Sequence, residues 1–176
     1  DATSPQLEKF AFDLSSSVTA TLTLNFNETV DARTLNTSAI TLQSGPTVAD
    51  HLKYTLREGG TLSVDGREIV VNVTVVDLNE VKANEGLYTE PNTAYLTIDA
   101  ALIKDMSGNP VNQITTANAM LATSFNDDVH RPRLVSYDLD MTSEILSLHF
   151  RETMDISSVN YGAFTLQSAS DDSGEE

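Results

Sequence analysis

The sequence predicts an all-β fold, and two observations lead to this prediction. The 176 residues contain no Cys and no Trp, and only 6% of them are aromatic. Val, Ile, Thr and Ser are frequent instead, and β-branched residues suit pleated strands. Apolar and polar residues also alternate with a period of two, most clearly over residues 18–26, as in a strand with one buried face. The length fits one domain with residues to spare.

Alternating segments with turns between them predict about seven strands before residue 127. Glycine and proline mark the turns, as in Glu58-Gly59-Gly60, Asp65-Gly66 and 107–110. The predicted strands are 7–14, 18–26, 39–43, 52–56, 68–76, 94–98 and 117–125. Residues 77–84 have helical spacing and predict one short helix. Such a series of strands is typical of an immunoglobulin-like β-sandwich, although the Cys and Trp of antibody domains are absent.

An internal repeat organises the chain. Residues 20–31 match residues 144–155 at an offset of 124, with Leu24 answered by Leu148, and the match continues without a gap into 39–44 and 163–168. Upstream, 4–7 matches 131–134, and we align Phe12-Asp13-Leu14 with Tyr137-Asp138-Leu139. A period of this length points to units that stack along the chain.

The repeat divides the chain into three parts. Residues 1–126 form one complete unit, 127–132 a short polar linker, and 133–176 the beginning of a second unit that ends in an acidic tail. In the second unit we expect strands at 134–139, 145–150 and 163–167.

Three strands cannot close a sandwich, and their open edges invite pairing. Either the chain is a segment of a longer protein, or another copy completes the fold by strand addition. In both cases the partners are copies or neighbouring repeats that associate head to tail, which builds open fibres.

Three motifs lie in a fixed order in the first unit. They are Phe26-Asn-Glu-Thr-Val-Asp31, Asp77-Leu-Asn-Glu-Val-Lys-Ala-Asn84 and Asp105-Met-Ser-Gly-Asn-Pro110. In this order they resemble the immunoglobulin-like tandem repeats of large extracellular proteins, both of the bacterial S-layer type and of protist surface proteins. The resemblance implies a component of a cell surface, matrix or filament, built of stacked β-sandwiches, with no catalytic residues to carry over.

The charge and the histidines exclude several function classes. A formal net charge of −16 with only 10 Lys and Arg cannot supply the cationic surface that nucleic acids require. No apolar stretch approaches the roughly 18 residues of a spanning helix, so we expect no membrane insertion. His51, His130 and His149 are isolated, and neither a G-x-S-x-G nor an H-E-x-x-H motif is present. We expect no enzymatic activity.

Three N-x-S/T sequons begin at Asn27, Asn36 and Asn72. Together they favour N-linked glycans and an extracellular or cell-surface location. In the segment around Asn72, the all-valine face of residues 71, 73 and 75 is the better core face, so Asn72 is expected to face solvent. The alternative is that these residues are unmodified polar groups on the outside of strands.

Acidic and amide side chains raise the question of a Ca²⁺ site, because this ion prefers several oxygen ligands. The candidate ligands are Asp77 with Asn79, and Asp105 with Asn109. The alternative is that Asp105 and Asn109 hydrogen-bond to the backbone of their own turn. Glu28 and Asp31 recur as Glu152 and Asp155. Because both units would need the same turn, we predict that these acids form turns after a strand.

The sequence therefore predicts a structural or assembly module of an extracellular, glycosylated tandem-repeat or filament-forming protein. The alternative is an adhesion module that binds carbohydrate or protein through loops at one end of the sandwich. Exposed aromatic side chains would carry that binding, and Tyr88, Tyr95 and Tyr161 are the candidates.

Overall fold

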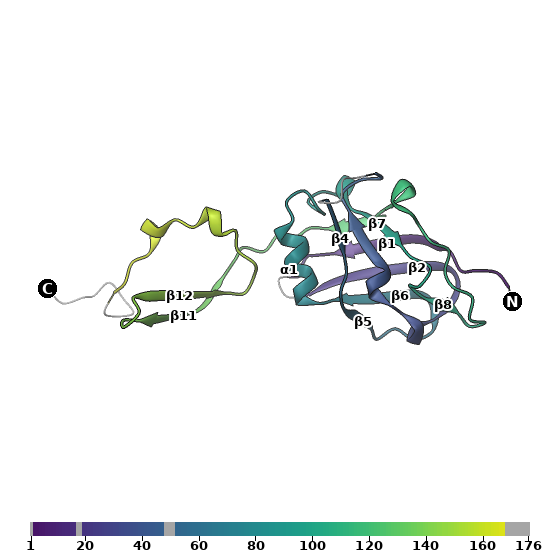
Figure 1. The fold of residues 1–176 in the computed structure, drawn as a ribbon, viewed down its shortest axis with the longest axis horizontal. Helices are drawn as coiled ribbons and strands as arrows, with labels where there is room; N and C mark the ends of the chain where they lie inside the picture. The colour runs from purple at the N-terminus through teal and green to yellow at the C-terminus, as the bar shows by residue number, and fades with distance from the viewer. Residues whose placement is uncertain (1, 17–18, 48–51, 168–176) are drawn as a thin grey trace.

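The computed structural model describes residues 2–16, 19–47 and 52–167, and the chain forms two units in a row (Figure 1). The first unit covers residues 2–126 and is a β-sandwich. The second unit covers residues 133–167 and is built on a hairpin. Residues 127–132 link them. Helix α1 lies at the end of the first unit that faces the second, and the chain enters the first unit at the opposite end (Figure 1).

The described part of the first unit contains ten strands and one α-helix, α1 (Val75–Ala83). The strands are β1 (Leu7–Asp13), β2 (Ala20–Asp31), β3 (Ile40–Gln43), β4 (Lys53–Thr55), β5 (Gly59–Thr61), β6 (Gly66–Val73), β7 (Tyr95–Ile98), β8 (Lys104–Asp105), β9 (Met120–Leu121) and β10 (Ser124–Asn126). Short 3-10 turns, η1 (Ala32–Thr34) and η2 (Thr37–Ala39), follow β2.

The strands of the first unit form two sheets. One sheet has the order β10-β1-β2-β6-β5, with β8 paired to the end of β2, and the other has the order β4-β3-β7-β9. All neighbouring strands are antiparallel except β1 and β10, which are parallel. The prediction of an all-β fold with one short helix is confirmed at this level.

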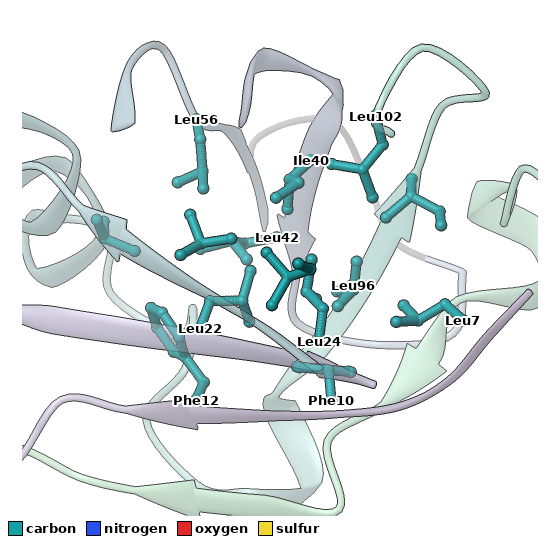
Figure 2. Packing of buried hydrophobic residues seen from close by; sticks show 14 of the residues in the cluster. Leu7, Phe10, Phe12, Leu22, Leu24, Ile40, Leu42, Leu56, Leu96 and Leu102 are labelled. Carbon is teal, nitrogen blue, oxygen red and sulfur yellow. The ribbon is translucent and has the colours of Figure 1, made fainter. Parts of the chain in front are cut away.

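The core lies between the two sheets, and alternate residues of the long strands, most clearly β2, are buried in it (Figure 2). Phe10 and Phe12 of β1 and Leu22 and Leu24 of β2 are at most 1% exposed. They pack toward the buried side chains of the facing sheet, which include Ile40, Leu42 and Leu96. Each side chain of this size stabilises the fold by about 1.5–3 kcal/mol when buried.

The segment around Asn72 confirms the predicted alternation as far as Val73, but the prediction that Val75 faces the core is wrong, because Val75 is 55% exposed. Val71 and Val73 are buried and Asn72 is exposed. The strand stops at Val73 and not at residue 76, because Thr74 caps α1: its side chain accepts a hydrogen bond from the Asp77 N–H. The helix therefore begins at Val75, two residues before the predicted start.

The predicted turn at Glu58-Gly59-Gly60 is wrong, because both glycines belong to β5. Gly59 has a φ of 142°, and a Cβ added there would lie 2.9 Å from the backbone oxygen of Asn72. Glycine is required at this position so that β5 can approach β6 closely.

The predicted strand over 117–125 is also wrong, because the segment is divided between the two sheets. The Ala122 N–H donates to the Ala94 oxygen beside β7, and the next residue, Thr123, donates to the Phe10 oxygen on β1. The chain thus crosses from one sheet to the other between β9 and β10, and a single period-two pattern cannot describe it.

The second unit repeats the first hairpin in detail. Strand β11 (Leu134–Asp140) pairs with β12 (Ile145–Phe150), and both hairpins have an irregularity at the same place, after Leu7 and after Leu134. Phe10 pairs with Leu24 in the first hairpin, and Tyr137 pairs with Leu148 in the second. The offset along the first strand is therefore 127, which corrects our alignment of Phe12 with Tyr137.

The turns after the second strand are repeated as well. Asp31 caps η1 and Asp155 caps η6 (Ile156–Ser158), each by accepting a backbone N–H two residues later. Asn36 and Asn160 cap η2 and η7 (Tyr161–Ala163) in the same way. The prediction that Asp31 and Asp155 form turns is confirmed.

The expected strand over 163–167 does not form. Its counterpart β3 is held between β4 and β7, and residues 164–167 have no such neighbours among the described residues of the second unit. None of the helices in the described ranges could span a membrane.

Candidate functional site

The three sequon asparagines are all exposed and lie on different elements. Asn27 is in β2, where its Oδ1 accepts the Gln6 N–H at 2.7 Å. Asn36 precedes η2 and accepts the N–H and the hydroxyl of Ser38. Asn72 faces outward from β6. The structure thus places each side chain at the surface and does not gather the three in one site.

Asp77 is a buried structural anchor. Asp77 is 0% exposed. Its carboxylate accepts hydrogen bonds from the Tyr54 hydroxyl at 2.7 Å and from the N–H groups of Arg57 and Glu58 at 3.1 and 3.3 Å. The Thr74 hydroxyl adds a fourth. Burial raises the pKa of Asp77, but these donors together outweigh burial and hold the pKa below its ordinary value.

The other candidate calcium ligands are not arranged around a common point with Asp77. Asn79 is exposed on α1. Asp105 accepts the N–H groups of Ser107 and Asn109 at 2.8 Å and the Asn109 side-chain amide at 2.7 Å. These are the turn hydrogen bonds of the alternative interpretation. Among the described residues no group of three or more acidic or histidine side chains could hold a metal ion.

Two of the histidines are described, and both lie at the surface. His130 is exposed in the linker, and His149 is 55% exposed with its Nε2 2.9 Å from Asp138 Oδ2. His149 occupies the register position of Asn25 in the first unit, as expected. His51 lies outside the described residues.

The prediction that Tyr88 is an exposed binding residue is wrong, because this side chain is only 2% exposed. Its ring makes edge contacts with Phe12 and Phe125, and its hydroxyl donates to the Tyr95 carbonyl oxygen at 2.6 Å. Tyr95 is partly buried in β7. Tyr161 is 79% exposed, so it is the one member of the predicted trio that is open to solvent.

The two units meet at a largely buried ionic cluster. Lys82 near the end of α1 contacts Asp128 of the linker, and its Nζ lies 3.9 Å from Oε2 of Glu152, which follows β12. The three side chains are only 15%, 16% and 7% exposed. Burial raises the pKa of Asp128, but the Lys82 ammonium and the His130 N–H more than offset this and lower the pKa.

A cleft of about 400 Å³ lies at this junction. Residues of the first unit, the linker and the second unit line it together, and they include Leu14, Tyr88, Pro132 and Thr153. The junction is therefore a shaped contact between units, with a charged cluster at one wall.

The second unit presents an open apolar face. Leu134, Tyr137 and Leu139 of β11 are 44%, 61% and 41% exposed. Their counterparts Leu7, Phe10 and Phe12 are 6%, 0% and 1% exposed because the second sheet covers them. Phe164 and Leu166, which match Ile40 and Leu42 in sequence, are also exposed at 42% and 66%. The residues of a sandwich core are thus present here without the covering sheet.

Comparison of the chain with protein-family models, with curated proteins and with solved structures finds no match.

Sequence reasoning missed the role of Lys82 and Glu152. Lys82 belongs to the motif at 77–84 and Glu152 to the repeated segment 144–155, but Glu152 was interpreted as a turn former. Its side chain instead faces Lys82, 70 residues earlier in the chain. The sequence did contain a signal. The glutamate recurs in both units as Glu28 and Glu152. The turn beside it needs only the aspartate, so the glutamate must have another role.

Proposed function

We propose that this chain is a structural module of an extracellular, glycosylated array of immunoglobulin-like β-sandwich repeats, which associate head to tail. One observation carries the proposal. The second unit repeats the strand register, the hairpin irregularity and both turn caps of the first unit. Repetition at the level of individual hydrogen bonds is typical of chains built from stacked copies of one unit.

The strand order supports the immunoglobulin-like assignment. In the first unit β1, β2, β6 and β5 lie together as do strands A, B, E and D of an immunoglobulin sandwich, and β4, β3, β7 and β9 lie as do C′, C, F and G. Helix α1 lies in the connection between β6 and β7, which passes from one sheet to the other. The buried core without Cys or Trp is the difference from antibody domains.

The exposure of all three sequon asparagines supports the glycosylated, extracellular part of the proposal. We expect the native protein to lose mass when treated with a peptide N-glycosidase, with Asn27, Asn36 and Asn72 converted to Asp, as read by peptide mass spectrometry. Asn118 is equally exposed but is not in a sequon, and it serves as the control that stays Asn. Unchanged mass and three intact asparagines would contradict this part.

The open face of the second unit supports the assembly part. Burying its large apolar side chains as fully as their counterparts in the first unit would contribute about 1.5–3 kcal/mol for each. A face of this kind is completed by a matching sheet. We propose that further residues with the same repeat supply that sheet, either along the same polypeptide or from a neighbouring copy.

The face can be tested on the 176-residue chain. We expect the 176-residue chain to self-associate as its concentration rises, because the apolar face is available to a second molecule. Size-exclusion chromatography with light scattering measures this association. The double substitution Tyr137→Ser with Leu139→Ser should shift the chain toward monomer by removing apolar contact area. It should leave the unfolding of the first unit unchanged, because neither side chain belongs to that core.

Val129→Ser is the matched control, because Val129 is 79% exposed but lies in the linker. It should leave self-association as it is. A chain that stays monomeric at all concentrations, or a double variant that associates as strongly as the Val129→Ser control, would rule out this face as an assembly surface.

A further inference from the structure

We propose that Glu28 marks a docking surface for the Lys82 end of a preceding repeat, so that the junction between the two units recurs at the other end of the first unit. This inference rests on the proposed function and names its contact. The occupant is another copy of the first unit, presenting the end of α1 and its linker. The geometry of the observed junction and the repeat together point to it.

The first step is that Glu28 and Glu152 have the same position relative to the incoming chain. The Asn27 N–H donates to the Gln6 oxygen, and the Arg151 N–H donates to the Arg133 oxygen, both at 3.0 Å. Each of these pairs joins the segment just after a proline, Pro5 or Pro132, to the residue just before the glutamate. A unit that leads into Pro5 therefore reaches Glu28 by the path that leads the first unit to Glu152.

The second step is that the acidic partners of Lys82 recur in sequence. Glu28 matches Glu152 within the Phe-x-Glu-Thr-x-Asp motif, and the offset of 127 aligns Asp1 with Asp128. Glu28 is partly buried and has no ion-pair partner among the described residues. Turn formation does not require this glutamate, because the aspartate of the motif caps the turn alone. A lysine from a preceding α1 gives it the partner that Glu152 has.

The third step is that Glu28 and the α1 end that carries Lys82 lie at opposite ends of the first unit. Helix α1 is at the end that faces the second unit, and the chain enters at the other end (Figure 1). Glu28 lies beside that entry, because its neighbours Phe26 and Asn27 contact Leu7 and Gln6. One unit therefore carries both halves of the contact and can propagate it in a line, as a heterologous interface does.

The test adds one unit to the whole chain. Residues 2–127 are placed directly before Asp1, so that Asp-Asp-Ala-Thr-Ser-Pro replaces the native Asp-Asp-Val-His-Arg-Pro at the new junction with equal length. The dilute protein is treated with a water-soluble carbodiimide, which joins an amine to a carboxylate in contact without a spacer, and linked peptides are identified by mass spectrometry.

In the native and the extended chain, we expect links from the Lys82 that precedes the second unit to Glu152 or Asp128. In the extended chain alone, we expect a link from Lys82 of the added unit to Glu28 of the unit that follows it. Glu28→Gln should abolish that link and leave the Glu152 link unchanged. A Glu152 link without a Glu28 link would overturn the docking surface and leave the array proposal standing. Absence of the Glu152 and Asp128 links in both chains would overturn the junction itself, and the inference with it.

Discussion

Replacing Asp77 with alanine is expected to lower the free energy of unfolding by about 3–5 kcal/mol. The substitution removes the acceptor for the Tyr54 hydroxyl and for two backbone N–H groups, and these donors stay in a part-buried site without a partner. It also removes the acceptor for the Thr74 hydroxyl at the start of α1. Urea denaturation followed by circular dichroism measures the change.

Two variants calibrate this result. Asp77→Asn keeps one acceptor oxygen and should lose about half as much. Glu80→Ala removes an exposed carboxylate from the same helix, 3.6 Å from Arg57, and should change the stability by less than about 1 kcal/mol. If Asp77→Ala were no more destabilising than Glu80→Ala, Asp77 would not be the anchor described above.

The lowered pKa of Asp77 gives the pH dependence its sign. The unfolded state binds a proton at a higher pH than the folded state, so ionised Asp77 contributes stability above the unfolded pKa near 3.8. This contribution is lost as the pH falls through the folded pKa. We therefore expect the difference in stability between the native chain and Asp77→Asn to shrink in acid below about pH 4.

Tyr88→Ala is expected to cost about 3–5 kcal/mol, the range for removing a large buried aromatic side chain. The ring makes edge contacts with both Phe12 and Phe125, whose ring centroids are 5.0 and 5.9 Å away. Tyr88→Phe keeps these ring contacts and removes only the hydrogen bond to the Tyr95 oxygen, so it should cost about 1–2 kcal/mol. Thermal and urea unfolding of the two variants separate packing from hydrogen bonding.

A small loss for Tyr88→Ala, close to that of Tyr88→Phe, would mean that the ring is not part of the core. The expected loss also has a bearing on function. Because the alanine variant is destabilised, any ligand binding lost with it cannot be attributed to direct contact with Tyr88, and Tyr161 is the suitable residue for a binding test.

Sequence patterns predict those parts of this fold that depend on neighbouring residues. Alternation identified Asn72 as outward and its valine neighbours as inward because each residue of a strand faces opposite to the next. The repeated Asp31 and Asp155 predicted turns because a side-chain cap acts over two residues. Both predictions needed only local geometry.

The parts that sequence could not predict depend on distant residues. Gly59 led to the prediction of a turn. Glycine is instead required there because β5 approaches the Asn72 carbonyl oxygen closely. Tyr88 was predicted to be an exposed aromatic side chain from the sequence alone. Its burial depends on contacts with Phe12 and Phe125, which are distant in the chain. Of the candidate site, the exposed sequons could be predicted, but the Lys82–Glu152 contact could not, because no short-range pattern brings these two side chains together.

The parallel pairing of β1 with β10 has a mechanical consequence. These strands are the first and the last of the first unit, and Ala11, Phe12 and Asp13 lie beside Ser124, Phe125 and Asn126. In the proposed array, stretching would pull β1 from one end of the chain and β10 from the other, in opposite directions. Tension therefore loads this ladder in shear, so that its hydrogen bonds share the force instead of opening one after another. The proposed array would therefore carry tension through the first and last strands of each unit.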